Sequence, residues 1–230
     1  MQTADLIIVA AGKGLRFGSD KPKQFVALNE KPILARALEA FERHTNVQNI
    51  VIVGSVDWLF HIQRNIVEKY DFAKVAHVVE GGRRRQDSVE LGLAKLDGDA
   101  EYVLVHDGAR PFASYKLIDD VLVGCRDVEA CIPALSLSDT IKEVEGEFIT
   151  KTLDRSILKR VQTPQAFKKD ALQKAFKFAH ENNIEATDEA YIIEKMGGKT
   201  RWIAGDFENI KITTQFDLKI AKLIVEQHES

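Results

Sequence analysis

The sequence predicts an α/β fold in which a mostly parallel, twisted sheet is flanked by helices and carries one inserted β-hairpin arm. Residues 6–9 form a short, unbroken apolar run, which is typical of a strand buried on both faces. Further runs of this kind alternate with segments of helical periodicity, which implies right-handed crossovers between parallel strands. Between 136 and 159 the periodicity changes to two, which indicates a hairpin. These three observations favour a Rossmann-like architecture with an added arm.

Each expected element follows from the spacing of its apolar residues. The expected strands are 6–9, 49–53, 75–79, 102–105, 130–134, 200–204 and 209–213. The expected helices are 32–44, 57–70, 88–96, 115–128, 169–182, 188–196 and 215–227. The helix at 32–44 has proline near its start, where a fixed φ is tolerated. Asp87 or Ser88 is expected to cap the helix at 88–96, and Thr187 the helix at 188–196.

The segment 136–159 is expected to form the arm. Residues 140–144 and 148–153 alternate apolar and polar side chains around a turn that contains Gly146. An isolated two-stranded hairpin is marginally stable in water, so this one is expected to pack on something. A second copy of the chain is the simplest candidate, and its own domain is the alternative. We therefore expect one domain over 1–230, with the arm at 136–159 used for dimerisation.

Composition narrows the class of protein. The chain has 230 residues, of which 45% are hydrophobic, and a formal net charge of -3. This length suits one domain with a sizeable core, and the near-neutral charge is unlike that of basic nucleic-acid-binding domains. Without an apolar run as long as a signal peptide or membrane span, a cytoplasmic protein that binds neither membrane nor nucleic acid is expected. Cys125 and Cys131 are expected to be reduced and structural.

A glycine-rich turn with several cations follows the first expected strand. Its glycines and basic residues are Gly12, Lys13, Gly14, Arg16, Gly18, Lys21 and Lys23. Glycines let backbone N–H groups come close to a ligand, and fixed cations offset the charge of a nucleoside triphosphate. The spacing fits neither the Walker A nor the dinucleotide fingerprint. An ordinary surface turn is the alternative, but the density of cations favours a polyphosphate-binding turn.

Four further segments carry polar side chains that could bind a ligand: two at strand ends, one in the arm and one directly after the arm. They are 80–89, 105–112, the two ends of the hairpin at 138–142 and 152–155, and 161–167. Ligands of α/β proteins bind at the carboxyl ends of parallel strands, where the first two segments lie. Each segment has a structural alternative. It is a solvated basic loop for 80–89 and a buried ion pair for 105–112. It is solvent-exposed cross-strand side chains for the hairpin ends and a proline-fixed turn for 161–167.

The motifs in these segments resemble those of one family of nucleotidyltransferases. AAGxGxRxG followed by PKQF resembles the signature of enzymes that activate phosphorylated sugars and polyols, and GGxxRxDSV, TLDR, QTPQxF and TDEA follow in order. Together they resemble the 2-C-methyl-D-erythritol 4-phosphate cytidylyltransferase family over nearly the whole chain. The resemblance implies transfer of CMP from CTP to that acceptor, giving CDP-methylerythritol and pyrophosphate in the non-mevalonate isoprenoid pathway. It also implies Mg²⁺ or another divalent cation as cofactor, and a homodimer formed through the arm.

The resemblance implies roles for individual residues. Arg16, Lys23 and Lys211 would be catalytic, as cations on the transferring phosphates. Nucleotide-binding roles fall on Ala10, Ala11, Gly12, Gly14, Gly82, Arg83 and Ser88. Acceptor-binding roles fall on Asp107, Arg110, Thr140, Arg155 and Thr163. Asp107 would also face Mg²⁺ through water, and the two arm residues would act in the neighbouring subunit's site.

Two positions depart from the family pattern, and two other functions stay open at this point. Gly108 stands where alanine is usual, and Glu208 stands where aspartate is more frequent. A ribitol 5-phosphate cytidylyltransferase would share much of the motif set. A non-catalytic CTP-binding module would need neither the arm residues nor Thr163. No histidine has metal-ligand spacing, and none is assigned a catalytic role.

Overall fold

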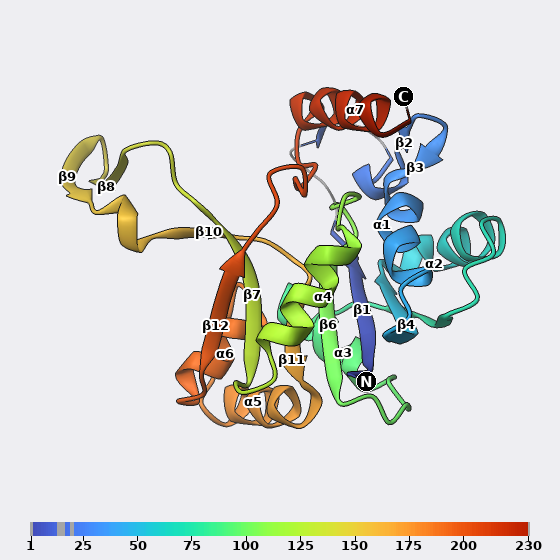
Figure 1. Cartoon of the computed structure of the whole chain (residues 1–230), viewed down its shortest axis with the longest axis horizontal. Coiled ribbons are helices and arrows are strands. Elements are labelled where there is room, and N and C mark those ends of the chain that lie inside the picture. Colours follow the sequence, from blue (N-terminus) through green and yellow to red (C-terminus); the bar gives the residue numbers. More distant parts are fainter. Residues whose placement is uncertain (1, 13–16, 19–20, 230) are drawn as a thin grey trace.

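A central sheet organises the molecule. The structure, a computed structural model, describes residues 2–12, 17–18 and 21–229. The strands of the sheet are β1 (Ala4–Ala10), β4 (Val47–Gly54), β5 (Val75–Glu80), β6 (Tyr102–Asp107), β7 (Ala130–Ser136), β10 (Lys159–Val161), β11 (Gln165–Lys168) and β12 (Thr200–Ala204). Their order is β10-β7-β11-β6-β1-β4-β5, with β12 also paired to β7. Figure 1 shows helices on both faces of this sheet.

The sheet is mostly parallel, as the alternation of strands and helices predicted. β1 lies between β4 and β6 and is parallel to both, and β4 is parallel to β5. β12 is parallel to β7. The exceptions are two short strands that the sequence analysis did not predict: β11 runs antiparallel between β6 and β7, and β10 runs antiparallel to β7. Since β1 and β6 are parallel neighbours, their carboxyl ends lie at the same edge.

The helices are α1 (Ile33–Glu42), α2 (Leu59–Ile62), α3 (Arg85–Leu93), α4 (Tyr115–Gly124), α5 (Lys169–Glu181), α6 (Glu189–Lys195) and α7 (Gln215–Glu229). Shorter turns are η2 (Lys23–Phe25), η3 (Val56–Trp58), η4 (Gln63–Glu68) and η5 (Arg155–Ile157). Leu6 and Ile8 of β1 pack with α1, α2 and α4, whereas Ile7 packs with α3, α5 and α6. This alternation along a buried strand gives three layers, with an apolar core on each face of the sheet.

A third apolar cluster places α7 over the end of the sheet that carries the site. Ala221 and Val225 of α7 pack on Leu28 of β2 (Ala27–Leu28), which pairs with β3 (Lys31–Pro32). Ile212, just before the helix, is buried in the same cluster. After β12, at the edge of the sheet beside β7, the chain therefore crosses back to cover the loops that follow β1.

Several expected boundaries were wrong. The helix expected at 57–70 divides into η3, α2 and η4, and η4 has the wider π-helical turn. The helix expected at 115–128 ends at Gly124. The strand expected at 209–213 is not formed, because Ile212 makes one backbone hydrogen bond, to Ala109 O at 2.9 Å, and no ladder. The alternating isoleucines Ile210 and Ile212 resemble a strand pattern, but these side chains are covered by the cluster that includes α7 and not by a neighbouring strand.

The two expected helix caps were also misplaced. α3 begins at Arg85, three residues before the expected start, and the Asp87 carboxylate accepts a hydrogen bond from the backbone N–H of Arg84 at 3.0 Å. Asp87 therefore acts from the third helical position, as the acidic partner of a capping box does. In α6 the cap is Asp188, whose carboxylate accepts from the backbone N–H of Tyr191.

The hairpin arm is formed as expected and projects away from the body of the molecule (Figure 1). β8 (Ile141–Glu145) pairs antiparallel with β9 (Phe148–Leu153) around a turn in which Gly146 has a φ of 59°. Phe148 is 77% exposed and Ile149 64%. Apolar side chains on an arm that does not fold back onto its own body leave a surface for something else to cover.

Two smaller expectations can be compared with the structure. Within the described residues, no helix has the length and apolar character needed to cross a membrane. Cys125 and Cys131 are free and buried, and burial raises the pKa of the two thiols to about 12 and about 11. Such thiols stay protonated at neutral pH, which fits the expected structural role.

Candidate active site

A cavity of about 480 Å³ opens at the carboxyl ends of β1 and β6. Its walls come from the turn after β1, the loop between β5 and α3, the turn after β6, and the segment before α7. The residues predicted for the site that line it are Ala10, Ala11, Gly12, Lys23, Gly82, Arg83, Ser88, Asp107 and Lys211. Four segments distant in sequence therefore meet at one edge of the sheet, as the topology of parallel strands requires.

Lys23 and Lys211 line this same cavity, although one comes from η2 and the other from the segment before α7. Lys23 is the first residue of η2, directly after Pro22, whose φ of -53° begins the turn. Arg16 and Gly14, which were also predicted for the site, lie outside the described residues. Two of the predicted cations are thus brought together by the fold.

Gln24 ties η2 to the glycine-rich turn. This side chain is buried, and its Nε2 donates to the carbonyl oxygens of Ala10 at 2.6 Å and Gly12 at 3.2 Å. The two bonds fix the end of β1 relative to Lys23. The sequence analysis recorded Gln24 only as part of a motif, because nothing local reveals which carbonyls it reaches.

The loop between β5 and α3 is packed closely at its glycines. The backbone N–H of Gly82 donates to Ser88 Oγ at 3.1 Å, and that hydroxyl donates to Arg84 O at 3.0 Å. A Cβ at position 82 would lie 2.4 Å from the Cβ of Asp87. Glycine is therefore required here by close approach, and the loop is held in one shape against the start of α3.

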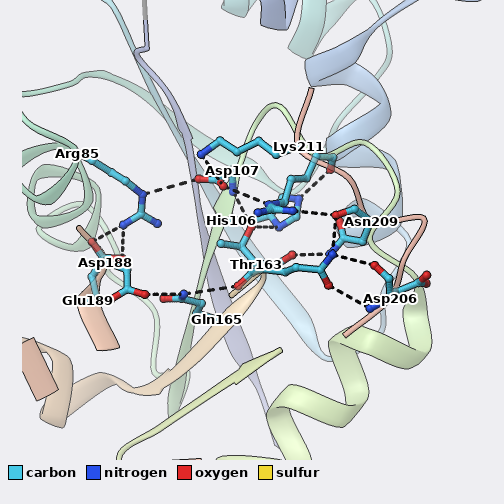
Figure 2. A network of polar contacts seen from close by, with 12 residues as sticks. Arg85, His106, Asp107, Thr163, Gln165, Asp188, Glu189, Asp206, Asn209 and Lys211 are labelled. Carbon is cyan, nitrogen blue, oxygen red and sulfur yellow. Dashed lines mark hydrogen bonds and ion pairs between the residues drawn. The ribbon is translucent and has the colours of Figure 1, made fainter. Parts of the chain in front are cut away.

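Asp107, at the end of β6, is surrounded by three cations (Figure 2). Its Oδ2 lies 2.9 Å from Lys211 Nζ and 3.3 Å from Arg110 Nε, and its Oδ1 lies 3.7 Å from Arg85 Nε. Burial alone would raise the pKa of this carboxyl, but the charges of Lys211, Arg85 and Arg110 hold that pKa well below its usual range. Asp107 is therefore ionised at any pH near neutrality.

Thr163 and His106 form a chain of hydrogen bonds with the backbone of Asp107. The Asp107 backbone N–H donates to Thr163 Oγ1 at 3.0 Å, and that oxygen lies 2.9 Å from His106 Nδ1. His106 Nε2 lies 2.9 Å from Arg110 O, which can only accept, so the ring proton is on Nε2 and the threonine hydroxyl donates to Nδ1. Burial lowers the pKa of His106 to about 4, so the ring is neutral. Thr163 is buried and does not line the cavity, and its expected place near the acceptor stays a prediction.

Arg110 also lies behind the cavity wall and does not line it. It is buried, with Nε directed to Asp107 and Nη1 donating to Asn209 O at 2.8 Å. Gln162 closes the same region, because its amide donates to Asp206 O at 2.8 Å and Asn209 O at 3.0 Å and accepts from the Asp206 N–H at 3.0 Å. These bonds fix the segment that leads to Lys211. They also give a physical role to the QTPQ motif, for which the sequence offered only a turn.

Arg85 is a cavity residue to which the sequence analysis assigned no role. Its Nη1 donates to both carboxylate oxygens of Glu189, at 2.8 and 2.7 Å, while its Nε faces Asp107. The only available signal was its place in the GGxxRxDSV motif. Glu189 was interpreted as a helix-terminal acid, since its partner lies 104 residues away in the sequence.

Thr140 and Arg155, at the two ends of the hairpin, do not line the cavity of their own chain. Both are exposed, and the Arg155 guanidinium donates to the carbonyl oxygen of Ser138. The ends of the hairpin are adjacent, as predicted, because Ile141 pairs with Leu153. One ligand could meet both side chains.

The described residues offer too few carboxylates and imidazoles to hold a metal ion by themselves. They contain no cluster of three or more histidine, cysteine, aspartate or glutamate side chains that could hold a metal. Asp107 supplies one carboxylate at the cavity wall. Mg²⁺ commonly takes one or two carboxylates and fills its octahedron with water and substrate phosphates. The donor set therefore fits Mg²⁺ carried mainly by a polyphosphate.

The fold and the site together define a nucleotidyltransferase, with a glycine-rich turn, two lysines in one cavity and a carboxylate at the strand ends of a Rossmann-like sheet. The family model "2-C-methyl-D-erythritol 4-phosphate cytidylyltransferase" matches residues 4–227. The chain belongs to this family.

Individual relatives and solved structures agree with the family match. The chain is 42% identical over 221 residues to the 2-C-methyl-D-erythritol 4-phosphate cytidylyltransferase of Clostridium novyi (strain NT), covering 96% of this chain and 95% of the relative. The corresponding protein of Clostridioides difficile (strain 630) is 37% identical, with 96% and 92% covered. The crystal structure of 4-diphosphocytidyl-2C-methyl-D-erythritol synthase from Anaerococcus prevotii DSM 20548 superimposes with a TM-score of 0.84 at 30% identity, covering 98% of this chain and 96% of that one.

Proposed function

We propose that this protein transfers CMP from CTP to 2-C-methyl-D-erythritol 4-phosphate and releases pyrophosphate, a step of the non-mevalonate isoprenoid pathway. Membership of the family supports this function, and the observation that carries it is the shared cavity of Lys23 and Lys211 at the glycine-rich turn. The family match favours 2-C-methyl-D-erythritol 4-phosphate over ribitol 5-phosphate as the acceptor. The Asp107 carboxylate, to which the resemblance gives an acceptor-binding role, favours an enzyme over a CTP-binding module.

The proposed reaction is a direct displacement. An oxygen of the acceptor's phosphate attacks the α-phosphorus of CTP, a new P–O bond forms, and the bond from the α-phosphorus to the bridging oxygen breaks as pyrophosphate leaves. The attacking phosphate is already an anion, so no general base is needed. The protein must align the two phosphates and stabilise the added negative charge. We assign that stabilisation to Lys23 and Lys211, together with Arg16.

The residues around the cavity also suggest where the nucleotide and the metal would bind. Ala10, Ala11 and Gly12 would contact the triphosphate through the backbone, while Gly82, Arg83 and Ser88 would contact cytosine and ribose. Gly82 and Ser88 are small, which leaves room for a pyrimidine and helps to exclude a purine. Mg²⁺ would neutralise charge on the phosphates when bound, with Asp107 holding it through water.

The arm would complete the site of a second subunit. Its exposed Phe148 and Ile149 suit burial in a dimer, and Arg155 suits a phosphate because its fork can donate two hydrogen bonds at once. Since Thr140 and Arg155 do not line the cavity of their own chain, and the arm formed by β8 and β9 projects from the body (Figure 1), we assign them to the acceptor phosphate in the partner's site.

Mixing two inactive variants tests the arm. Arg155→Ala and Lys23→Ala are each expected to be nearly inactive, yet a heterodimer contains one site with an intact body and an intact arm. After statistical exchange of subunits, about a quarter of the wild-type activity should return, because about half of the dimers are mixed and each has one working site. Activity that stays at the level of the separate variants, or elution of the protein at the monomer mass, would reject the arm's role.

The Gly82→Ala variant tests the nucleotide assignment. The added methyl group would collide with the Cβ of Asp87, which is anchored to the helix backbone and cannot rotate away. The loop must shift at a cost of about 1–3 kcal/mol, so the Kd for CTP is expected to rise about tenfold. Isothermal titration calorimetry with CTP measures this, and the matched control is Gly146→Ala in the arm turn. An unchanged Kd would place the nucleotide elsewhere.

The activity itself is tested by pyrophosphate release. Wild-type protein with CTP, Mg²⁺ and 2-C-methyl-D-erythritol 4-phosphate is expected to release pyrophosphate, and ribitol 5-phosphate is expected to replace the acceptor poorly. CTP binding without pyrophosphate release would favour the nucleotide-binding module instead.

A further inference from the structure

A buried ion pair connects α6 to the cavity through Arg85. The Glu189 side chain is 1% exposed, and Arg85 Nη1 lies 2.8 and 2.7 Å from its two carboxylate oxygens. Burial raises the pKa of Glu189, but the guanidinium beside it favours the ionised form. Arg85 lines the cavity and Glu189 does not. Figure 2 shows Arg85 joined to Glu189 on one side and to Asp107 on the other.

The pair is aimed at Asp107. Because Glu189 occupies Nη1, the guanidinium presents its Nε to Asp107 Oδ1 at 3.7 Å, while Asp107 Oδ2 stays with Lys211 at 2.9 Å. An arginine without this restraint could turn its two-pronged edge to the carboxylate and form the shorter bidentate pair. That rotation would compete with Lys211 for Asp107.

The position of Glu189 is itself fixed. Asp188, the preceding residue, caps α6 through its Oδ1 and accepts from Gln165 Nε2 at 3.2 Å through its Oδ2. Gln165 is a residue of β11, the strand paired with β6, which carries Asp107. α6 is thereby registered to the same strand pair that holds the carboxylate.

We propose that Glu189 is a positioning residue of the reaction: it holds Arg85 in the orientation that keeps the Asp107 carboxylate between Arg85 and Lys211. This inference rests on the proposed function and adds to it a residue that contacts neither substrate. It assigns the TDEA motif a role in the site, beyond that of starting a helix. The carboxylate that would hold Mg²⁺ through water thus has its direction set from α6.

A double-mutant cycle tests the proposal. The full-length wild type is compared with Glu189→Gln, Asp107→Asn and the double variant, with kcat and both KM values measured by pyrophosphate release and folding followed by thermal unfolding. Glu185→Gln is the matched control, because Glu185 also pairs with an arginine, Arg84, at 2.7 Å, but its side chain is 77% exposed.

Glu189→Gln is expected to lower kcat about 10- to 100-fold, as is common for residues that orient a site ligand, with the KM for CTP within about twofold of wild type. In the Asp107→Asn background the same change should cost less than about threefold, because no carboxylate is left to orient. Glu185→Gln should behave as wild type.

Three results would overturn the proposal: a kcat for Glu189→Gln within about twofold of wild type, effects that multiply in the double variant, or losses that follow the fraction unfolded. If Glu189→Gln does not fold, Glu189→Asp keeps the charge and shortens the reach, and the same cycle is run with it. Failure of both to fold would make the pair structural and overturn the proposal too. An inactive wild type would instead count against the proposed function.

Discussion

Replacing Lys23 with alanine is expected to lower kcat by a hundredfold or more. Lys23 lines the cavity beside the turn that follows β1, where the triphosphate would lie. Removing one preorganised group that stabilises developing negative charge costs about 3 kcal/mol in comparable sites. The loss should appear in turnover more than in binding, because the charge on the phosphates increases in the transition state. Steady-state pyrophosphate release at saturating CTP and acceptor measures it.

The control for this prediction is Lys116→Ala. Lys116 lies on α4 with its side chain 82% exposed, where it pairs with Asp120. This variant carries the same loss of one charge and should keep wild-type turnover. A Lys23→Ala enzyme within threefold of wild type would show that the reaction does not depend on this ammonium group.

Lys211→Met should have an effect of the same size, at least about a hundredfold in kcat, for two reasons. The ammonium group is lost from the phosphates, and Asp107 loses the cation nearest its Oδ2. Methionine keeps the length and apolar stem of the side chain, so packing is little changed. The ion pairs that remain to the Asp107 carboxylate are those with Arg85 and with Arg110, which lies behind the cavity wall.

Lys222→Met, on the exposed surface of α7, is the matched control for Lys211→Met. Lys211→Arg is informative as well, because it keeps the charge but its planar fork would pair differently with Asp107. We expect it to recover part of the activity. Wild-type turnover in Lys211→Met would mean that the contact with Asp107 serves only the fold.

The strands and the glycine-rich turn could be predicted because their signals are local. An apolar run buried on both faces predicts β1, and the general rule for parallel sheets then places the ends of β1 and β6 together. Lys23 and Lys211 could be assigned to one site by resemblance, and the topology explains why they meet. The missed strand β11 has four residues, of which Gln165 and Lys168 are polar, so its place in the sheet is decided by pairing with β6 and β7 and not by its own pattern.

The supporting contacts of the site could not be predicted in the same way. Gln162, Thr163 and Glu189 reach partners 44 to 104 residues away, and no local periodicity reports such a distance. Thr163 shows the difference most clearly. Resemblance implies a place near the acceptor, which stays a prediction, whereas no local pattern indicates its hydrogen bonds to His106 and Asp107.

The order of the site residues along the chain has a consequence for how the protein becomes active during synthesis. The half of the sheet built from β1, β4, β5 and β6 contains its own parallel pairs and is complete by Asp107. Arg85 and Arg110, which pair with this aspartate, precede the arm. Thr163, Glu189 and Lys211 belong to the last third of the sequence, after the arm. A chain emerging from the ribosome would therefore possess its glycine-rich turn long before its carboxylate is aligned.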